Sequence, residues 1–217
     1  MSAARERVLG RIRTALGRTA PLPHADAEPL QAYLAARPIG PQPRRREDLV
    51  AQFRDCALRA STTIDAVETD AAAPAAVARY LRSQGLPPAA VVWPELAWLP
   101  WREAGIAVAI RKADANDAVG ITGAFCALAE TGTLAQLSGP QRPASTSLLP
   151  PTHVAVLPVQ RIVSAMEDAW ALLRTEQGAL PRAVNLISGP SRTADIEQTL
   201  VLGAHGPCRV HIVLTQG

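Results

Sequence analysis

Cysteine is scarce in this chain of 217 residues, and the three cysteines, Cys56, Cys126 and Cys208, lie far apart. An odd and widely spaced set predicts neither a disulfide framework nor a CxxC metal or redox motif. A cubane iron–sulfur cluster usually needs four closely spaced thiolates, so we expect no such cluster in this chain. The pattern is typical of a reduced, cytoplasmic protein without a redox centre of its own.

Long apolar runs, aromatic residues and lysine are scarce as well. No stretch approaches 18 uninterrupted apolar residues, and no signal peptide is recognisable, so we expect neither a membrane span nor export. Aromatic residues make up 4% of the chain, and Lys112 is the only lysine among 22 basic residues. Nucleic-acid-binding proteins more often combine aromatic residues with clustered lysine and arginine, so this class is not expected despite the net charge of +3.

The first 44 residues predict a segment separate from the domain that follows. Val8, Ile12 and Leu16 recur at helical spacing between arginines, which predicts an amphipathic helix over residues 3–16. Such a helix docks on a partner or forms a homo-oligomer, and an organellar transit peptide is the alternative. Residues 18–43 are rich in proline and predict an extended arm.

Strand and helix patterns alternate over residues 45–217, where we expect one folded domain. Helices are predicted over residues 46–59, 74–84 and 162–173, and strands over 62–68, 89–93, 106–110, 153–157, 183–187 and 209–214. The apolar run 121–129 and the segment 134–137 predict a β-hairpin. This order predicts an α/β fold in three layers, with a mixed, mostly parallel sheet and helices on both faces.

The turn of that hairpin, Glu130-Thr131-Gly132-Thr133, is the first candidate site. A partly buried carboxylate at the end of an apolar strand can have a raised pKa and act as acid, base or nucleophile. Gly132 can adopt the positive φ that the turn needs, and Thr131 and Thr133 offer hydroxyls to a ligand. The alternative is that Glu130 only accepts hydrogen bonds from the turn.

The second candidate site is the string GPSRTADIE, which contains Gly189, Ser191, Arg192, Thr193 and Asp195. It follows a predicted strand and is expected to begin a helix. The positive end of that helix, with Arg192, would bind a small phosphate or carboxylate. Alternatively, Ser191 or Thr193 caps the helix and no ligand binds. Neither a Walker lysine pattern nor a GxGxxG fingerprint is present, so nucleotide triphosphates and dinucleotides are not expected.

His205, in the string GAHGP, is a candidate proton carrier or hydrogen-bond donor near the same strand ends. Glu130, Asp195 and His205 are therefore the candidate catalytic residues. His153 and His211 lie in predicted strands, where we expect hydrogen-bonded structural histidines. The sequence has no HExxH motif and no closely spaced cluster of metal ligands, so no metal site is expected.

Several strings in the last half of the chain, in this order, resemble the LUD-domain family: GITGA, AETGT, LP before HV, GPSRTADIE and GAHGP. The resemblance implies a fold similar to the isomerase, CoA-transferase and formyltetrahydrofolate cyclo-ligase group. It also implies a role in oxidising L-lactate to pyruvate beside two partner proteins that carry iron–sulfur clusters. No firm catalytic residue comes with the family.

Three functions follow as hypotheses. The first is a non-redox subunit or accessory protein of a lactate-oxidising system, with no cofactor in this chain. The second is a free-standing acyl or CoA transferase or ligase in which Glu130 forms an acyl intermediate. The third is a regulatory module that binds a small carboxylate or phosphate. The proposed site requires Glu130 and Arg192 to lie on the same side of the molecule.

Overall fold

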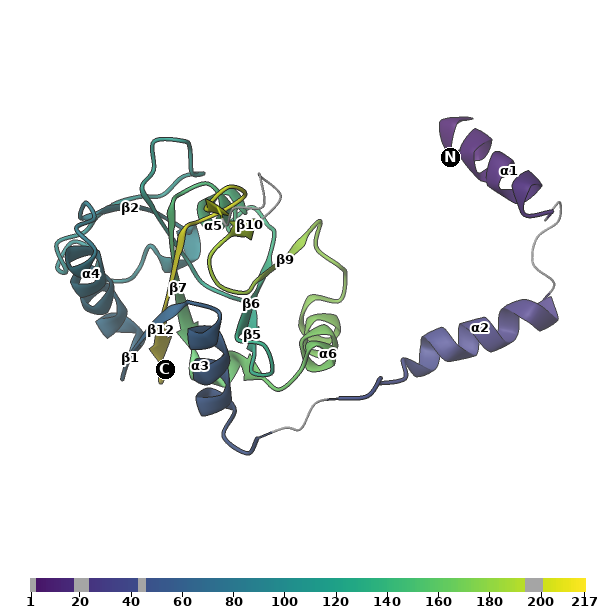
Figure 1. Cartoon of the computed structure of the whole chain (residues 1–217), viewed down its shortest axis with the longest axis horizontal. Helices are drawn as coiled ribbons and strands as arrows, with labels where there is room; N and C mark the ends of the chain where they lie inside the picture. The colour runs from purple at the N-terminus through teal and green to yellow at the C-terminus, as the bar shows by residue number, and fades with distance from the viewer. Residues whose placement is uncertain (1–2, 18–23, 43–45, 194–200) are drawn as a thin grey trace. The chain divides into compact units, whose positions relative to one another are not determined.

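The computed structural model describes residues 3–17, 24–42, 46–193 and 201–217. The chain divides into two compact units, Met1–Gln42 and Pro43–Gly217. The first unit contains the helices α1 (Ala3–Ala15) and α2 (His24–Ala36) (Figure 1). Helix α1 agrees with the prediction, and Val8 and Ile12 on it are exposed. Among the helices of the described residues, none has the length and apolar character to cross a bilayer.

Helix α2 shows that the extended arm predicted for residues 18–43 was wrong over residues 24–36. Pro29 lies inside this helix, where it cannot donate a main-chain hydrogen bond. The residues after Pro29 are mainly leucine and alanine, which have high helix propensity. The proline content of residues 18–43 therefore indicated an extended arm where most of residues 24–36 favour a helix.

The second unit is built on a parallel sheet of six strands in the order β1-β12-β7-β4-β2-β3. These strands are β1 (Thr63–Val67), β2 (Ala89–Val92), β3 (Ala107–Ala109), β4 (Val119–Thr122), β7 (Thr152–Pro158) and β12 (Arg209–Thr215). Strand β12 follows all the others in the chain, yet it lies between β1 and β7 (Figure 1). The predicted strands of this sheet are confirmed within one or two residues at each end.

The predicted hairpin is present, but it belongs to a second sheet with the order β8-β5-β6-β9. The strands of this smaller sheet are β5 (Cys126–Leu128), β6 (Thr133–Leu137), β8 (Ile162–Val163) and β9 (Val184–Ile187). The apolar run 121–129 is thus divided, because residues 121–122 lie in β4 and residues 126–128 lie in β5. A short antiparallel pair, β10 (Arg192–Thr193) and β11 (Val201–Leu202), completes the strands of the described residues.

Helices cover both faces of the six-stranded sheet, as the sequence predicts (Figure 1). On one face, α4 (Ala73–Ser83) packs Val77 and Leu81 against Val92 and Val213. On the other face lie α3 (Leu49–Arg59), α5 (Ser145–Leu148) and the smaller sheet. The short 3-10 turns η1 (Asp70–Ala72), η2 (Pro94–Leu96) and η3 (Val159–Arg161) lie in the connections.

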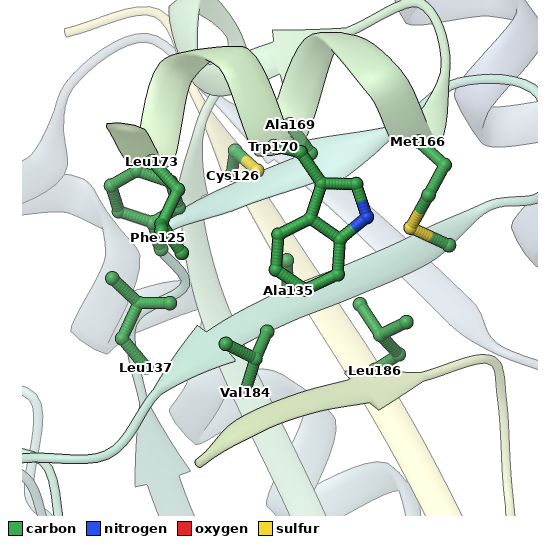
Figure 2. Close-up of a pocket in the computed structure, with 10 residues that line it drawn as sticks. All are labelled: Phe125, Cys126, Ala135, Leu137, Met166, Ala169, Trp170, Leu173, Val184 and Leu186. Atoms are coloured by element: carbon green, nitrogen blue, oxygen red, sulfur yellow. The ribbon is translucent and has the colours of Figure 1, made fainter. Parts of the chain in front are cut away.

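Helix α6 (Met166–Gln177) covers the outer face of the smaller sheet. Figure 2 shows Trp170 of α6 above Ala135, with Met166 and Leu186 beside the indole ring. The space between these side chains has a volume of about 10 Å³ and an apolar lining. A space of this size holds at most one water, so this contact is part of the core and not a ligand site. Burial under the helix raises the pKa of the Cys126 thiol to about 11.

Gly120 allows α5 to lie directly on β4. A Cβ atom at this position would be 1.9 Å from the carbonyl oxygen of Thr146, which is a main-chain atom of α5. Gly120 is the register partner of His153, and residues that pair in this way present their side chains on the same face. The close approach therefore places α5 beside the buried His153.

We expect Gly120→Ala to destabilise the second unit by about 3 kcal/mol, because the new methyl group forces β4 and α5 apart. Gly139→Ala is the matched control, since a Cβ there meets no atom within 4 Å. Urea unfolding followed by far-UV circular dichroism measures both variants. Equal free energies of unfolding for the two variants would show that α5 does not need this close contact.

Candidate functional site

The two segments that the sequence singles out meet at one edge of the smaller sheet. Strand β6 is antiparallel to both β5 and β9, so β5 and β9 end where β6 begins. Glu130 comes two residues after β5, Thr133 opens β6, and Ser188 follows β9 directly. The structure therefore brings the ETGT turn and the start of the GPSR loop side by side.

A chain of three hydroxyls joins these segments. The Oγ1 atoms of Thr131 and Thr133 are 2.7 Å apart, and the Thr133 Oγ1 is 2.6 Å from the Ser188 Oγ. Two hydrogen bonds use two of the three hydroxyl hydrogens, so one hydrogen can still be donated to another group. Ser188 was missed by sequence reasoning, because its role depends on the pairing of β6 with β9.

Both turns pack against the C-terminal end of α3, and each needs a glycine to come this close to it. A Cβ atom on Gly132 would be 2.3 Å from the main-chain nitrogen of Ala57, and one on Gly189 would be 2.1 Å from the carbonyl oxygen of Ala60. Both glycines also have positive φ, 68° and 77° respectively, as predicted for Gly132. The two turns therefore contact the C-terminal half of the same helix.

Glu130 is half-buried, and its hydrogen bonds anchor it to two helices. Its Oε1 atom accepts a hydrogen bond from the main-chain N–H of Met166, the first residue of α6, at 3.0 Å. Its main-chain carbonyl accepts a hydrogen bond from the Cys56 thiol of α3 at 3.4 Å. The carboxylate thus occupies the positive end of the α6 dipole, which stabilises the start of that helix.

The loop with Ser191 folds against the GAHGP loop. The Ser191 N–H donates to the Pro207 carbonyl at 2.8 Å, and the His205 N–H donates to the Ser191 Oγ at 3.3 Å. The His205 side chain is exposed. Arg192 is also exposed, and its Nη2 donates to the Oγ of Ser61, directly beyond the end of α3.

The GPSRTADIE string is extended where it reaches Thr193. Arg192 and Thr193 form strand β10, in which they pair with β11. Thr193 is β-branched, and such residues favour extended backbone. Ser191 therefore does not cap a helix, because the two residues after it are extended. The helix predicted after Thr193 falls on residues outside the described part of the chain, so a cap at Thr193 stays a prediction. Asp195 lies outside the described residues.

Glu130 and Arg192 both lie near the C-terminal half of α3, but their side chains have different partners. Cys56 contacts the Glu130 main chain, and Ser61 contacts Arg192. The carboxylate of Glu130 binds α6, and no ion pair between it and Arg192 is present in the described structure. The three hydroxyls are thus hydrogen-bonded to one another. Glu130 and Arg192 share a neighbour, because each contacts a residue of α3 or of the segment that follows it.

A second polar cluster, not predicted from the sequence, lies between the two sheets. Gln136 of β6 donates through Nε2 to the Thr122 Oγ1 at 2.7 Å and to the Gly123 carbonyl at 3.0 Å. The same Thr122 hydroxyl lies 2.7 Å from the Nε2 of His153 in β7. His153 is completely buried, and this burial lowers its pKa to about 4.

His211 is buried on the opposite face of the six-stranded sheet. Its Nδ1 lies 2.9 Å from the Thr63 Oγ1, and its ring stacks on Tyr80 with 3.9 Å between the ring centroids. Burial lowers the pKa of His211 to about 4. Both histidines are hydrogen-bonded through one ring nitrogen, as predicted, and the other ring nitrogen of each is buried without a partner among the described residues.

The fold and these contacts define a parallel α/β domain with a smaller second sheet that carries the motif-bearing turns. The LUD domain family model matches residues 44–215, and the chain belongs to the LUD-domain family. A crystal structure of a DUF162 family protein from Deinococcus radiodurans has the same fold, with a TM-score of 0.58 and 22% sequence identity over 80% of this chain and 99% of that chain.

Curated relatives match a shorter part of the chain. Lactate utilization protein C of Exiguobacterium sp. is 39% identical over 54% of this chain and 56% of its own length. Lactate utilization protein C of Bacillus subtilis is 40% identical over 48% of this chain and 45% of its own length. The chain thus spans about half the length of the curated relatives it matches.

The two buried histidines predict a stability that falls as the pH is lowered. The unfolded chain binds protons below the usual histidine pKa of about 6.5, whereas the folded chain resists protonation until about pH 4. Between these values the unfolded state binds more protons, so each histidine lowers the free energy of unfolding by up to about 3 kcal/mol.

Urea unfolding at pH 7, 6, 5 and 4 measures this fall. His211→Phe keeps an aromatic ring against Tyr80 but cannot titrate, so we expect a shallower dependence on pH for this variant. The same dependence in the variant and in the unmodified protein would contradict a contribution from His211.

Proposed function

We propose that this protein is a non-redox subunit or accessory protein of a system that oxidises L-lactate to pyruvate together with iron–sulfur partner proteins. The observation that carries this proposal is the match of residues 44–215 to the LUD domain, with relatives named lactate utilization protein C. In this proposal the partner proteins transfer the electrons, and this chain binds a ligand or helps to assemble the complex.

The positions of the three cysteine thiols support the proposal that the iron–sulfur clusters lie in the partner proteins. Cys56 donates to the carbonyl of Glu130 at 3.4 Å, and Cys208 donates to the carbonyl of Pro151 at 3.3 Å. Cys126 lies in the core beneath α6. The thiols thus occupy three different parts of the unit, whereas a cluster needs several thiolates around one point.

Deletion of the gene in its own host is expected to slow growth on L-lactate as sole carbon source and to leave growth on glucose unchanged. Expression of the chain from a plasmid should restore growth on lactate. Growth rates in minimal medium measure both effects. Normal growth of the deletion strain on lactate would remove the proposed role.

An affinity-tagged chain purified from lactate-grown cells is expected to bring iron-containing partner proteins with it. The matched control replaces Cys56, Cys126 and Cys208 with alanine. Because the proposal places the clusters in the partners, the cysteine-free variant should retain the same iron content and should restore growth. Iron analysis and absorbance near 400 nm measure this, and loss of iron with a variant that keeps the circular dichroism of the unmodified chain would place the cluster in this chain.

The alternative function, an acyl or CoA transferase that uses Glu130, makes a different prediction. The hydrogen bond from Met166 favours an anchoring role for this carboxylate over a nucleophilic role. We therefore expect no covalent adduct when the protein is incubated with acyl-CoA donors, and mass spectrometry of the intact protein measures it. An adduct that forms on the unmodified protein and is lost in Glu130→Gln would instead establish the transferase.

The same variants measure the anchoring role. Glu130→Gln keeps an oxygen that can accept from Met166 and should destabilise the protein by less than about 1 kcal/mol. Glu130→Ala removes the acceptor and should cost about 2 kcal/mol. Equal losses of unfolding free energy would show that charge alone, and not the hydrogen bond, is important here.

A further inference from the structure

A basic cleft lies at the edge of the smaller sheet opposite the ETGT turn. At this edge β6 ends at Leu137 and β9 begins at Val184, which are register partners. The cleft has a volume of about 620 Å³, within the range of roughly 300–1,000 Å³ that is usual for small-molecule sites. We define the basic cleft by its polar lining residues: Lys112, Ser138, Arg142, Ser145 and Arg182.

Three connections that are distant in the sequence supply the cations of the basic cleft. Lys112 lies between β3 and β4, Arg142 lies between β6 and α5, and Arg182 precedes β9. Among the described residues that line the cleft, none is acidic. Like charges in one cleft repel one another, and an anion between them relieves this repulsion.

Two of these cations are available to a ligand. Lys112 and Arg182 are exposed, and neither forms an ion pair with any residue in the described part of the chain. Arg142 donates through Nε to Glu95 at 2.6 Å, and that bond does not use the two terminal nitrogens of its guanidinium group. The cleft therefore has donors from three cationic groups.

One of the two serines of the basic cleft adds a donor. The Ser138 Oγ accepts from the Ala183 N–H at 2.8 Å, so its own hydrogen can still be donated. The Ser145 Oγ is buried and has no hydrogen-bond partner among the described residues. Because this oxygen has no accessible surface, it does not count among the donors that a ligand in the cleft can contact.

A neighbouring cleft also contains arginines, but their charges are already paired with carboxylates of the protein. It has a volume of about 330 Å³ and shares Arg142 with the basic cleft. Its other cation, Arg161, is already bonded to both carboxylate oxygens of Glu176, at 2.7 and 3.0 Å. Both cations there are paired with carboxylates of the protein, whereas Lys112 and Arg182 of the basic cleft form no ion pair with a described residue.

We propose that the basic cleft binds the phosphate group of a small metabolite, with Lys112, Arg142 and Arg182 contacting the phosphate oxygens. A phosphate monoester carries a charge of about −1.5 to −2 near pH 7 and several acceptor oxygens, which match the donors of three cationic groups and the Ser138 hydroxyl. A monocarboxylate such as lactate carries a single charge and needs only one cation. This site is separate from the ETGT and GPSR segments, and the inference does not rest on the proposed function.

Isothermal titration calorimetry at constant ionic strength tests the proposal with inorganic phosphate, pyrophosphate, malonate and L-lactate. We expect the full chain to bind phosphate and pyrophosphate. Lys112→Ala and Arg182→Ala should each weaken pyrophosphate binding by about tenfold, the loss expected for one charge-assisted contact. Arg182→Lys, which keeps the charge, should lose less affinity than Arg182→Ala.

Arg174→Ala is the matched control, because Arg174 is an exposed arginine of α6 that does not line the basic cleft. It should leave the affinity within about twofold. Circular dichroism and melting temperatures show that each variant is folded. The proposal is overturned if neither phosphate probe binds, if Arg174→Ala weakens binding as much as Arg182→Ala, or if malonate or lactate binds as tightly as pyrophosphate.

Discussion

Two turns of the smaller sheet approach the main chain of α3 more closely than any residue with a side chain allows. Gly132 and Gly189 meet this requirement, and both also adopt a left-handed backbone. Their contacts with α3 place Thr133 next to Ser188 and direct the Glu130 side chain toward α6. The positions of the ETGT turn and of the start of the GPSR loop therefore depend first on how closely their main chains pack against α3.

The contact between the two sheets combines apolar packing with a few buried polar groups. Leu134 packs against the core of the six-stranded sheet, and Gln136, two residues further along β6, faces the same way. The Nε2 of its amide donates to Thr122 and Gly123, whereas its Oε1 is buried without a partner among the described residues. Such directional bonds restrict the relative position of the two sheets more than apolar contacts alone would.

Much of the fold was predictable from the sequence because local patterns specify it. Alternating apolar segments indicated the parallel strands, and Gly132 indicated the hairpin turn. Other features depend on tertiary contacts. The hairpin joins a separate sheet, Arg192 and Thr193 pair with β11, and the role of Ser188 appears only when β9 lies beside β6. The cations of the basic cleft come from three separate connections, so their proximity has no signature in the sequence.

The place of β12 also has a consequence for how the domain forms. Thr63 of β1 bonds His211 of β12, and these residues are 148 positions apart in the chain. Strand β1 has no other neighbour in its sheet, so during synthesis it stays unpaired until the ribosome has released β12. Contacts between such distant segments close slowly. Until then the nascent chain carries β1 as an unpaired strand, an element that folded proteins pair or cover.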